Sequence, residues 1–292
     1  MPELPEVETI VRELNGEVLD RTFLDVWSDA KSLIKQPAFE NFEKQIKGKK
    51  IIKVRRRAKN ILIDLSGGYV LLIHQKITGH LLVGKWKRNN GGWSPMEEGP
   101  LSEDPMNRFL HVVFLLDDGR QLALSDARKF AKIELWKREE LEKSEDFVKI
   151  GPEPLEDDFT VAKFISLFKN KKGKIKQVLM DQNFIAGIGN IYASEILFEA
   201  MVHPEEDVGK IDAEDLKKIY NATRRILNKS IELKGDSFSD FRTITGEKGD
   251  FQNFTKVYQR EGEKCPRCGG RIKRIVQGGR SSFFCPNCQV KK

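Results

Sequence analysis

The sequence predicts an α+β protein with an N-terminal helix and an antiparallel β-sandwich, followed by a helical domain and a small C-terminal hairpin. Short β-rich runs fill residues 21–136, whereas helical spacing dominates residues 160–234. Two Cys-x-x-Cys pairs stand near the C-terminus. Because 292 residues are enough for two hydrophobic cores, we expect domains at 1–150 and 151–240 and a further module at 241–292.

The first segment predicts a helix with one buried face, because apolar residues recur there at helical spacing. These residues are Leu4, Val7, Val11 and Leu14, and Gly16 is expected to end the helix. The β-rich runs that follow are TFLDVW, KIIKVRRRAKNILIDL, YVLLIHQ, FLHVVFLL, RQLALS and KIELW. In LLDDGRQLAL the Asp-Gly pair suits a hairpin turn that needs positive φ. Several such strands predict an antiparallel sandwich.

Residues 86–107 are rich in glycine, proline and charge and show no periodicity, so they predict a long surface loop. Trp86 and Trp93 within it suit solvent-exposed decoration, with an added DNA or partner contact as the alternative. Near Gly151 the pattern changes to helical segments, FTVAKFISLF, KQVLMD, NIYASEILFEAM and AEDLKKIYNATRRILNKSIEL. A polar, glycine-containing loop over 236–253, whose composition fits mobility, then leads into the C-terminal module.

Charge is distributed unevenly along the chain. The net charge is +7, and residues 242–292 hold 12 Lys/Arg against 4 Asp/Glu, whereas the other 241 residues hold 39 against 40. A basic segment of this kind is typical of phosphate binding, and a solvated basic tail is the alternative. The chain shows no apolar run of 18 residues and no signal-peptide layout. We therefore expect a cytoplasmic protein that does not enter membranes.

The cysteine spacing is the sharpest motif. The four cysteines are Cys265, Cys268, Cys285 and Cys288. Two Cys-x-x-Cys pairs supply four thiolates that close tetrahedrally on a structural Zn²⁺, whereas two disulfides do not suit a reducing cytosol. The intervening RIKRIVQ and RSSFFC read as strands joined at Gly278-Gly279, which places Arg280 at a hairpin tip. There it can bind a phosphate, or remain a solvated turn residue.

The stretch IAGIGNIYASE is not a dinucleotide-binding fingerprint. Tyr192 replaces the third glycine of that pattern, and a helical segment rather than a strand precedes the motif. What remains is a glycine turn that delivers Asn190 to the start of a helix. Such a helix start can hold a phosphate, and simple N-capping with tight helix packing is the alternative.

The opening MPELPEVETI places Pro2 and Glu3 at the start of the first helix. A free α-amino group has a pKa of about 8, which the helix N-terminus lowers further. An unprotonated Pro2 amine is a nucleophile that can form an iminium with an aldehyde-like carbon, and Glu3 would be an adjacent acid or base. The alternative is that the Met-Pro start has no catalytic meaning.

Several motifs, in the right order, make the whole chain resemble a bacterial formamidopyrimidine-DNA glycosylase. They are PELPEVET at 2–9, RRRAKN at 55–60, DARKF at 126–130, GPEPL at 151–155, IKQVLMDQNFIAGIGNIYASEIL at 175–197, GEKCPRCG at 262–269 and GRSSFFCPNCQ at 279–289. The resemblance implies a helix–two-turns–helix element in the helical domain, one structural zinc, and removal of oxidised purines from duplex DNA with cleavage of the abasic site. Leu4 stands where the related endonuclease VIII group usually has glycine, which favours the purine branch.

Carried over by position, the resemblance implies that Pro2 attacks C1′ of the damaged nucleotide, forming a Schiff base, while Glu3 moves protons at the sugar. Lys59 would contact the sugar-phosphate, and Arg280 would grip phosphates and support the second step of β,δ-elimination.

The DNA contacts implied in the same way come from His74, His111, Lys171 and Asn190, and lone histidines are also commonly structural. Arg128 and Phe130 would fill the gap left by an extruded base. Ile77 stands where the family usually has methionine, and it is stiffer. The loop 236–253 corresponds to the family's lesion-capping loop.

Two other functions remain open on the sequence. An endonuclease VIII-like enzyme for oxidised pyrimidines has the same nucleophile and fold, and a DNA-binding relative could lack the chemistry. Pro2, Glu3 and Lys59 together favour an enzyme, because binding alone does not need them. The sequence carries no signal for oligomers, so we expect a monomer. It does not determine the preferred lesion or the opposite base.

Overall fold

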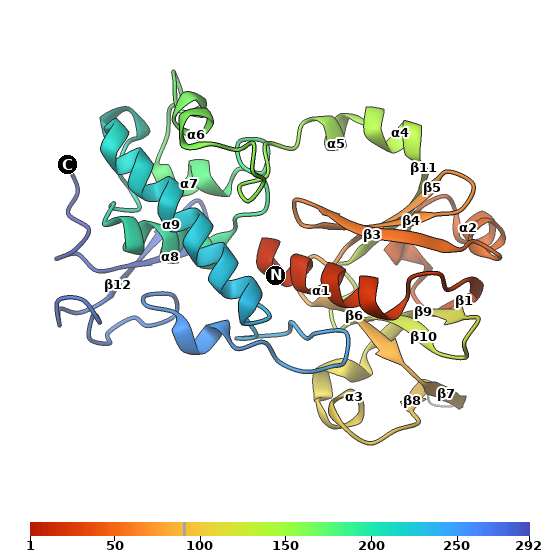
Figure 1. Ribbon diagram of the computed structural model, residues 1–292. Coiled ribbons are helices and arrows are strands. Elements are labelled where there is room, and N and C mark those ends of the chain that lie inside the picture. The colour runs from red at the N-terminus through yellow and green to blue at the C-terminus, as the bar shows by residue number, and fades with distance from the viewer. Residues whose placement is uncertain (90–91) are drawn as a thin grey trace. The chain divides into compact units, whose positions relative to one another are not determined.

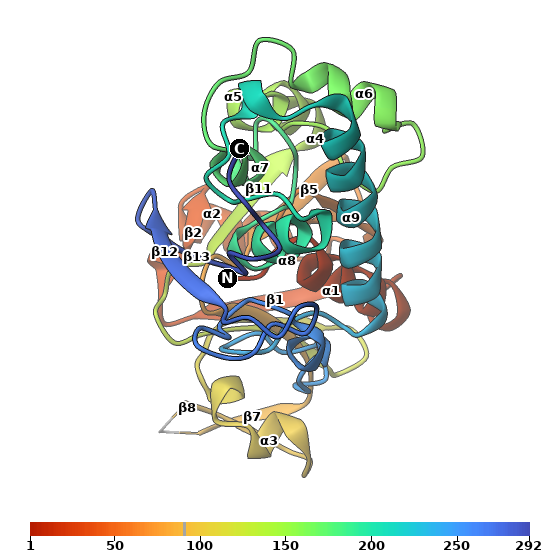
Figure 2. The ribbon, with the colours of Figure 1, turned by 90° about the vertical axis from the view of Figure 1, so that its left-hand side faces the viewer.

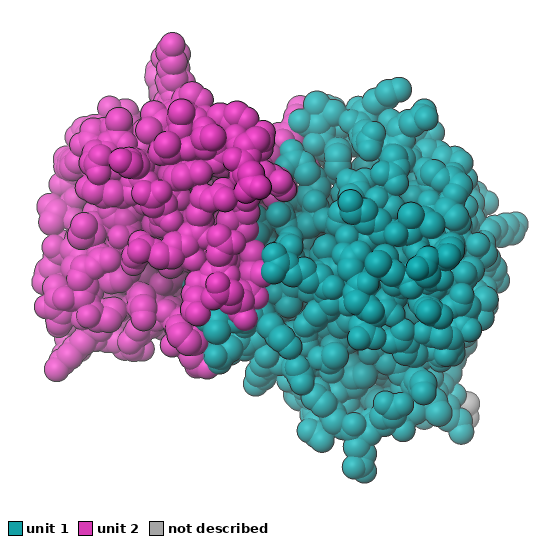
Figure 3. Space-filling view, in the orientation of Figure 1, with its two compact units in different colours: residues 1–148, 233–252 teal, residues 149–232, 253–292 magenta. Residues whose placement is uncertain are grey.

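The computed structural model describes residues 1–89 and 92–292. These residues form two compact units, each built from two segments of the chain (Figure 3). Unit 1 comprises Met1–Val148 and Leu233–Gln252, and unit 2 comprises Lys149–Glu232 and Asn253–Lys292. The chain first passes from unit 1 to unit 2 after Val148, which is close to the expected boundary at Gly151. The segment 233–252 returns to unit 1, whereas the sequence grouped residues 241–292 into one module.

Unit 1 contains two large sheets, a small two-stranded sheet and, at its start, helix α1 (Leu4–Glu17) (Figure 1). The four-stranded sheet has the order β1 (Phe23–Ser28), β9 (Leu110–Leu116), β10 (Gln121–Asp126), β6 (Gly79–Gly84). The five-stranded sheet has the order β2 (Ile34–Gln36), β11 (Lys132–Lys137), β5 (Tyr69–His74), β4 (Asn60–Leu65), β3 (Ile51–Arg57). Pairing is antiparallel as predicted, except that β11 and β2 are parallel. The short strands β2 and β6 were not predicted.

The main core of unit 1 consists of buried apolar side chains from both large sheets and from helices α1 and α2 (Phe39–Ile46). Val7 and Leu14 of α1 belong to it, as the helical spacing predicts. Each such aliphatic side chain contributes about 1.5–3 kcal/mol when it is removed from water. Phe241 and Ile244 belong to the same core, which explains why the segment 233–252 returns to this unit.

Residues 86–107 are not the exposed, structureless loop that the sequence predicts. Their described part forms β7 (Trp86–Asn89), β8 (Gly92–Pro95), α3 (Pro100–Glu103) and the short helix η2 (Pro105–Arg108). Helix η2 ends one residue after the end of this segment. Trp86 is only 3% exposed and packs with Leu82 and Val113, so its expected exposure is wrong. The reason lies in β6 and β9, whose apolar residues are nearly continuous rather than alternating, so both faces of that sheet require cover.

The outer face of the five-stranded sheet is covered by a second short extension. Helices α4 (Arg138–Lys143) and α5 (Glu145–Val148) follow β11 directly. Leu141 and Phe147 pack there with Leu62 and Val70 of the sheet. Both large sheets of unit 1 therefore have apolar contacts on two sides.

Unit 2 is built from the helices and the hairpin that the sequence predicts, although the sequence assigns them to two separate regions, 151–240 and 241–292 (Figures 1 and 2). The helices are α6 (Val161–Leu167), α7 (Ile175–Met180), α8 (Asn190–Ala200), η3 (Val208–Lys210) and α9 (Ala213–Glu232), and the hairpin is β12 (Lys273–Gln277) with β13 (Arg280–Phe284). The short helix η4 (Phe251–Phe254) spans the crossing between the units. Helix α8 contacts α7, α9 and β13. Its Tyr192 is fully buried and its hydroxyl lies 2.6 Å from Ser230 of α9.

A buried carboxylate joins α8 to the segment that leads into the hairpin. Glu195 accepts backbone N–H bonds from Lys256, Val257 and Tyr258 at 2.8–3.0 Å. Burial raises the pKa of Glu195 and outweighs these hydrogen bonds.

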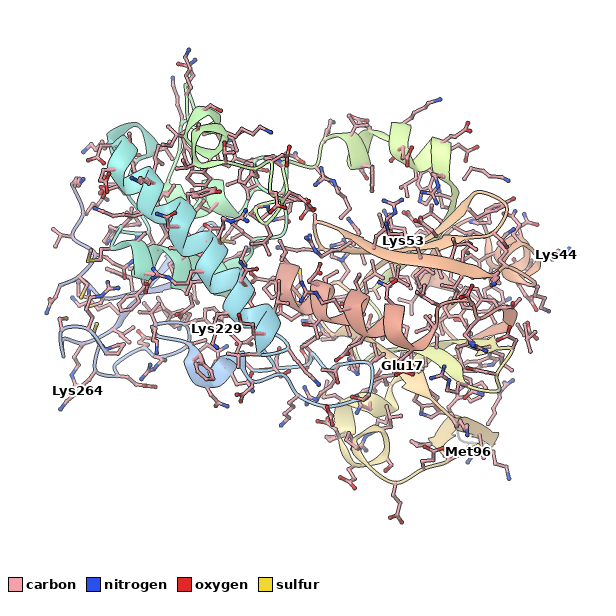
Figure 4. The ribbon with its side chains drawn as sticks, viewed as in Figure 1. Glu17, Lys44, Lys53, Met96, Lys229 and Lys264 are labelled. Carbon is pink, nitrogen blue, oxygen red and sulfur yellow. The ribbon has the colours of Figure 1, made fainter. Side chains whose placement is uncertain are left out.

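Both units carry exposed lysines, among them Lys44 and Lys53 of unit 1 and Lys229 and Lys264 of unit 2 (Figure 4). None of the helices in the described part of the chain is both long and apolar enough to cross a membrane.

Candidate active site and nucleic-acid interface

The N-terminus is held at the start of α1 by acidic side chains. Pro2 and Glu3 are buried, and Glu3 is the N-cap residue of the helix. The Glu6 carboxylate accepts the backbone N–H of Glu3 at 2.7 Å through Oε2. Its other oxygen accepts the backbone N–H of Asp236 at 2.8 Å. Glu6 therefore connects the Pro2–Glu3 dipeptide to the beginning of the loop 236–253.

Lys59 and His74 lie at one end of the five-stranded sheet. Lys59 is in the turn between β3 and β4 and is 6% exposed, and the pairing of Ile61 with Ile73 places this turn near the end of β5. Burial, and then the charge of nearby lysines, lowers the pKa of His74 from 6.5 to about 3. The lysines are Lys76, Lys59 and Lys132. His74 is therefore a neutral ring within a cationic cluster.

The hydrogen bonding of His74 determines which ring nitrogen carries the proton. Its Nδ1 accepts the backbone N–H of Lys76 at 3.0 Å. Because Nδ1 is then the unprotonated nitrogen of a neutral imidazole, the proton is on Nε2. His74 thus offers one N–H donor beside Lys59, as a phosphate contact requires.

His111 stands in a different setting, on β9. Its Nδ1 lies 2.8 Å from the Asp29 carboxylate. This partner gives the ring a structural role, and a DNA contact by His111 stays a prediction.

Two turns of unit 1 meet at one buried carboxylate. Asp126 is fully buried, and its Oδ2 accepts the backbone N–H groups of Phe130 and Ala131 at 2.7 and 2.8 Å. Its Oδ1 accepts the Thr78 hydroxyl and, at 3.3 Å, the Arg128 N–H. One carboxylate therefore fixes both the turn that contains Ile77 and the turn that contains Arg128 and Phe130.

The tips of these turns carry large exposed side chains. Ile77 is 39% exposed and Phe130 is 48% exposed. The Arg128 guanidinium lies over the Phe130 ring, 4.6 Å from its centroid. Exposed apolar groups on rigid turns can enter a base stack, which is the role that the resemblance assigns to these three residues.

Unit 2 contains a pocket of about 220 Å³ bordered by α7, the start of α8 and the hairpin. Arg280, Asn190 and Lys176 line it, together with Gln177, Met180, Asp181, Gln277, Gly278 and Ser282. Arg280 begins β13 opposite Gln277, with Gly278 and Gly279 as the two-residue turn, so the predicted hairpin and its tip are confirmed. Asn190 Oδ1 is buried and has no hydrogen-bond partner among the described residues. Two cations, Lys176 and Arg280, and one carboxylate, Asp181, therefore border the same pocket.

Sequence reasoning missed Lys176, which is nearly fully buried. Its Nζ donates to the Ser281 carbonyl and the Ser282 hydroxyl, both at 2.9 Å, and so fixes the hairpin against α7. Lys171 does not line the pocket; it pairs with Asp181 at 3.5 Å. The available signal was the position of Lys176 inside the IKQVLMDQ motif, directly after the residue that starts the helix.

The four cysteines converge as a metal site. Their Sγ atoms all lie within 4.8 Å of one another, with 3.5 Å between Cys268 and Cys285 and 3.9 Å between Cys265 and Cys288. Tetrahedral zinc with Zn–S bonds of about 2.3 Å separates its sulfurs by about 3.8 Å, whereas a disulfide needs about 2 Å. The cysteines therefore form a structural zinc site, and the predicted Zn²⁺ is confirmed over the disulfide alternative.

A cation-rich end of the five-stranded sheet and a zinc-held hairpin are features of a nucleic-acid-binding protein. Three family models match the chain: the formamidopyrimidine-DNA glycosylase N-terminal domain over residues 1–133, the H2TH domain of the same enzyme over 150–242, and the zinc finger found in FPG and IleRS over 262–290.

Relatives match over nearly the whole chain. Formamidopyrimidine-DNA glycosylase of Pelotomaculum thermopropionicum is 38% identical over 292 residues, covering 100% of both chains. The enzyme of Ruegeria sp. is 36% identical and covers 99% of this chain and 100% of its own. Among solved structures, Lactococcus lactis Fpg with abasic-site DNA has a TM-score of 0.85 at 31% identity, covering 99% of this chain and 100% of that one.

The chain belongs to the formamidopyrimidine-DNA glycosylase family. It is accordingly a DNA glycosylase of oxidised-purine repair, as the sequence predicts.

Proposed function

We propose that the nitrogen of Pro2 is the nucleophile that excises the damaged base and cleaves the abasic site. The observation that carries this proposal is the burial of Pro2 and Glu3 at the start of α1, where Glu6 fixes the Glu3 backbone. Removal of Met1 makes Pro2 a free secondary amine, and the positive end of the helix dipole favours its unprotonated form. A buried amine of this kind is competent for covalent catalysis.

The bond changes follow from the amine. The Pro2 nitrogen bonds to C1′ as the glycosidic bond breaks and the base leaves with its electron pair and a proton. Opening of the sugar ring then gives an iminium, and loss of the C2′ proton breaks the bond from C3′ to its phosphate. A second elimination then breaks the bond from C5′ of the same sugar to its phosphate. Glu3, adjacent to Pro2, relays protons at the sugar.

Three groups of residues then have separate tasks on the DNA. Lys59 and the Nε2–H of His74 bind the sugar-phosphate of the damaged nucleotide. Ile77, Arg128 and Phe130 fill the gap in the stack, which offsets the few kcal/mol lost on extrusion of the base. Arg280, Lys176 and Asn190 bind phosphate in the pocket of unit 2, which supports the second elimination. His111 and Lys171 make weaker contacts with the DNA backbone.

The loop 236–253 covers the extruded base. Its connection to Glu6 supports this assignment, because the same carboxylate holds the Pro2–Glu3 dipeptide. The substrates that we propose are 8-oxoguanine and formamidopyrimidines in duplex DNA, and a structural neighbour, a Lactococcus lactis FPG variant, was solved with Fapy-dG DNA. Action on chromosomal DNA places the protein in the bacterial cytoplasm.

Borohydride trapping tests the nucleophile directly. The untagged protein is expected to form a covalent adduct through Pro2 on duplexes that contain 8-oxoguanine or an abasic site. Pro2→Gly, or a tag fused before Pro2, should abolish strand cleavage while DNA binding largely remains. The same tag at the C-terminus is the matched control and should leave cleavage intact. Normal cleavage by the N-terminally tagged protein would refute the assignment.

A thymine-glycol duplex belongs in the same experiment. Preferential trapping on that substrate would assign the chain to pyrimidine repair. Binding without an adduct on every duplex would show that the fold is present without its chemistry.

A further inference from the structure

The loop 236–253 is held on both sides of a short exposed tip, Phe238–Asp240. Before the tip, Asp236 donates its N–H to Glu6, and Ser237 is buried. After the tip, the Ile244 carbonyl accepts the Val83 N–H at 2.8 Å. The chain is thereby hydrogen-bonded to the outer edge of β6. Phe238 itself is 43% exposed. The composition of the loop fits mobility, whereas these contacts hold the chain on both sides of the tip, and the Phe238 N–H itself donates to Asp236 Oδ1 at 3.0 Å.

Arg242 organises the backbone around this tip. Its Nη1 donates to the Ser239 carbonyl at 3.0 Å and to the Phe241 carbonyl at 2.7 Å. The Phe241 carbonyl also accepts the Ser237 hydroxyl at 2.9 Å. The guanidinium therefore determines where the chain enters and leaves the tip.

Arg242 is in turn held by a residue of the 86–107 segment. Its Nε and Nη2 donate to the two oxygens of Asp104 at 2.7 and 3.1 Å. Only 4% of the arginine side chain and 16% of the aspartate side chain are exposed. Such two-point, charge-assisted pairs are among the strongest side-chain hydrogen bonds and fix orientation as well as distance. Asp104 also accepts the Met106 N–H at 2.9 Å, and this second donor helps to orient the carboxylate toward Arg242.

A second contact runs beside this pair through Asn107. Its amide nitrogen donates to the carbonyls of Pro100 at 2.8 Å and Gly246 at 3.0 Å. Both amide protons are then used, so Oδ1 must accept, and the His80 Nε2 that lies 3.0 Å away carries a proton. Gly246 has φ +85°, and a Cβ there would lie 2.5 Å from the Asn107 nitrogen. No larger residue fits this position.

The described part of the segment that supplies Asp104 and Asn107 packs against the four-stranded sheet. Trp86 is buried against the sheet, and Trp93 and Leu101 pack beside it. The rings of Trp27 and Trp93 meet edge to face at 5.6 Å. Asp104 is therefore presented from a packed surface rather than from a free loop.

We propose that Asp104 is a positioning residue for damaged-base recognition, which acts through Arg242 to set the conformation of the tip Phe238–Asp240. This inference rests on the proposed function of the loop 236–253 and deepens it. Asp104 touches neither the DNA nor the reacting atoms. Asp104 therefore affects excision of the damaged base, which requires the loop to cover that base. It does not affect cleavage of an abasic site, from which the base is already absent.

The test compares two substrates in two variants. Asp104→Ala is expected to lower the single-turnover rate on an 8-oxoguanine duplex about tenfold, while cleavage of an abasic duplex changes less than about twofold. Glu103→Ala, an exposed acidic neighbour, is the matched control and should leave the ratio of the two rates at the wild-type value. Asp104→Asn keeps the volume and one acceptor, and it should give an intermediate ratio even if Asp104→Ala folds poorly.

Amide hydrogen exchange of the free protein gives an activity-independent readout. Residues 237–242 should exchange at least fivefold faster in Asp104→Asn than in the wild type or in Glu103→Ala. Unchanged exchange, or equal losses on the lesion and abasic duplexes, would overturn the proposal. A wild-type protein that cuts neither duplex would instead refute the proposed function, while the exchange measurement would still decide whether Asp104 positions the loop.

Discussion

The two units hold the residues that we propose to contact DNA by different physical means. Unit 1 fixes its turns with buried carboxylates above a large apolar core, as Asp126 and Glu6 show. The hairpin of unit 2 has only a small apolar cluster, which includes two of the cysteines, and it depends on the metal site together with the hydrogen bonds that Lys176 donates to Ser281 and Ser282. The comparison implies that damage to unit 1 should remain local, whereas loss of zinc should release the hairpin as a whole.

Removal of the metal should cause the largest loss of DNA binding, and the structural change should be confined to unit 2. Cys285→Ala, or chelation of zinc, removes the support of the hairpin that carries Arg280, so we expect DNA binding to weaken at least 100-fold. All four tryptophans, Trp27, Trp86, Trp93 and Trp136, lie in unit 1. Their fluorescence should therefore remain native. A coincident loss of tryptophan signal would break the comparison, because the units would then unfold together.

Asp126→Ala should give the next largest effect, now in unit 1. Removing this carboxylate leaves buried donors of two turns unpaired, so we expect a loss of about 3 kcal/mol in the free energy of unfolding. Excision of a paired lesion should fall at least tenfold, and zinc content should stay at one per chain. Urea unfolding followed by tryptophan fluorescence measures the loss. Native stability in the variant would show that Asp126 does not hold the turns.

A buried histidine should make unit 1 sensitive to acid. Burial lowers the pKa of His80 from 6.5 to about 4, so the unfolded chain binds its proton first as the pH falls. Stability should therefore be complete above about pH 6.5, and this residue should contribute a loss of about 2 kcal/mol by pH 5. His80→Gln should be less stable at neutral pH but should lose less on acidification. Parallel pH profiles in urea unfolding would contradict the assignment.

Ile77→Met should give the smallest effect on stability, because the side chain is 39% exposed and is not among the described residues that form the main core of unit 1. We expect Tm to change by less than about 2 °C. A flexible thioether reaches further into the stack than a branched side chain, so the preference for the opposite base should shift by about two- to fivefold. Excision rates with cytosine and adenine opposite the lesion measure it. Equal preferences in both proteins would remove Ile77 from the gap-filling group.

Local patterns predicted much of the fold and the zinc site. Leu4, Val7 and Leu14 are buried as their spacing predicts, and the cysteine spacing brings four sulfurs together. These features depend on neighbours in the sequence or on a metal with fixed geometry. The strand β6 escaped prediction because GHLLVG is short and does not alternate.

The long-range contacts could not be read from the sequence. Asp104 and Arg242 are 138 residues apart, and Glu6 and Asp236 are 230 apart. A single aspartate in a charged, glycine-rich segment looks like any solvated acid, and the apolar outer face that buries Trp86 appears only once the sheet is assembled. The catalytic roles came from the family resemblance, because Pro2 and Lys59 have no spacing that distinguishes them from ordinary residues.

The contact of Asn107 with Gly246 also bears on how this protein can change during evolution. The segment 86–107 and the turn at 243–247 are far apart in the gene, yet a side chain at position 246 would collide with Asn107. A larger residue at 246 therefore requires a change at Asn107, and we expect a recombination event that exchanged one stretch without the other to be unfavourable. A designer who transplants this segment into another glycosylase must move Arg242 and Gly246 with it.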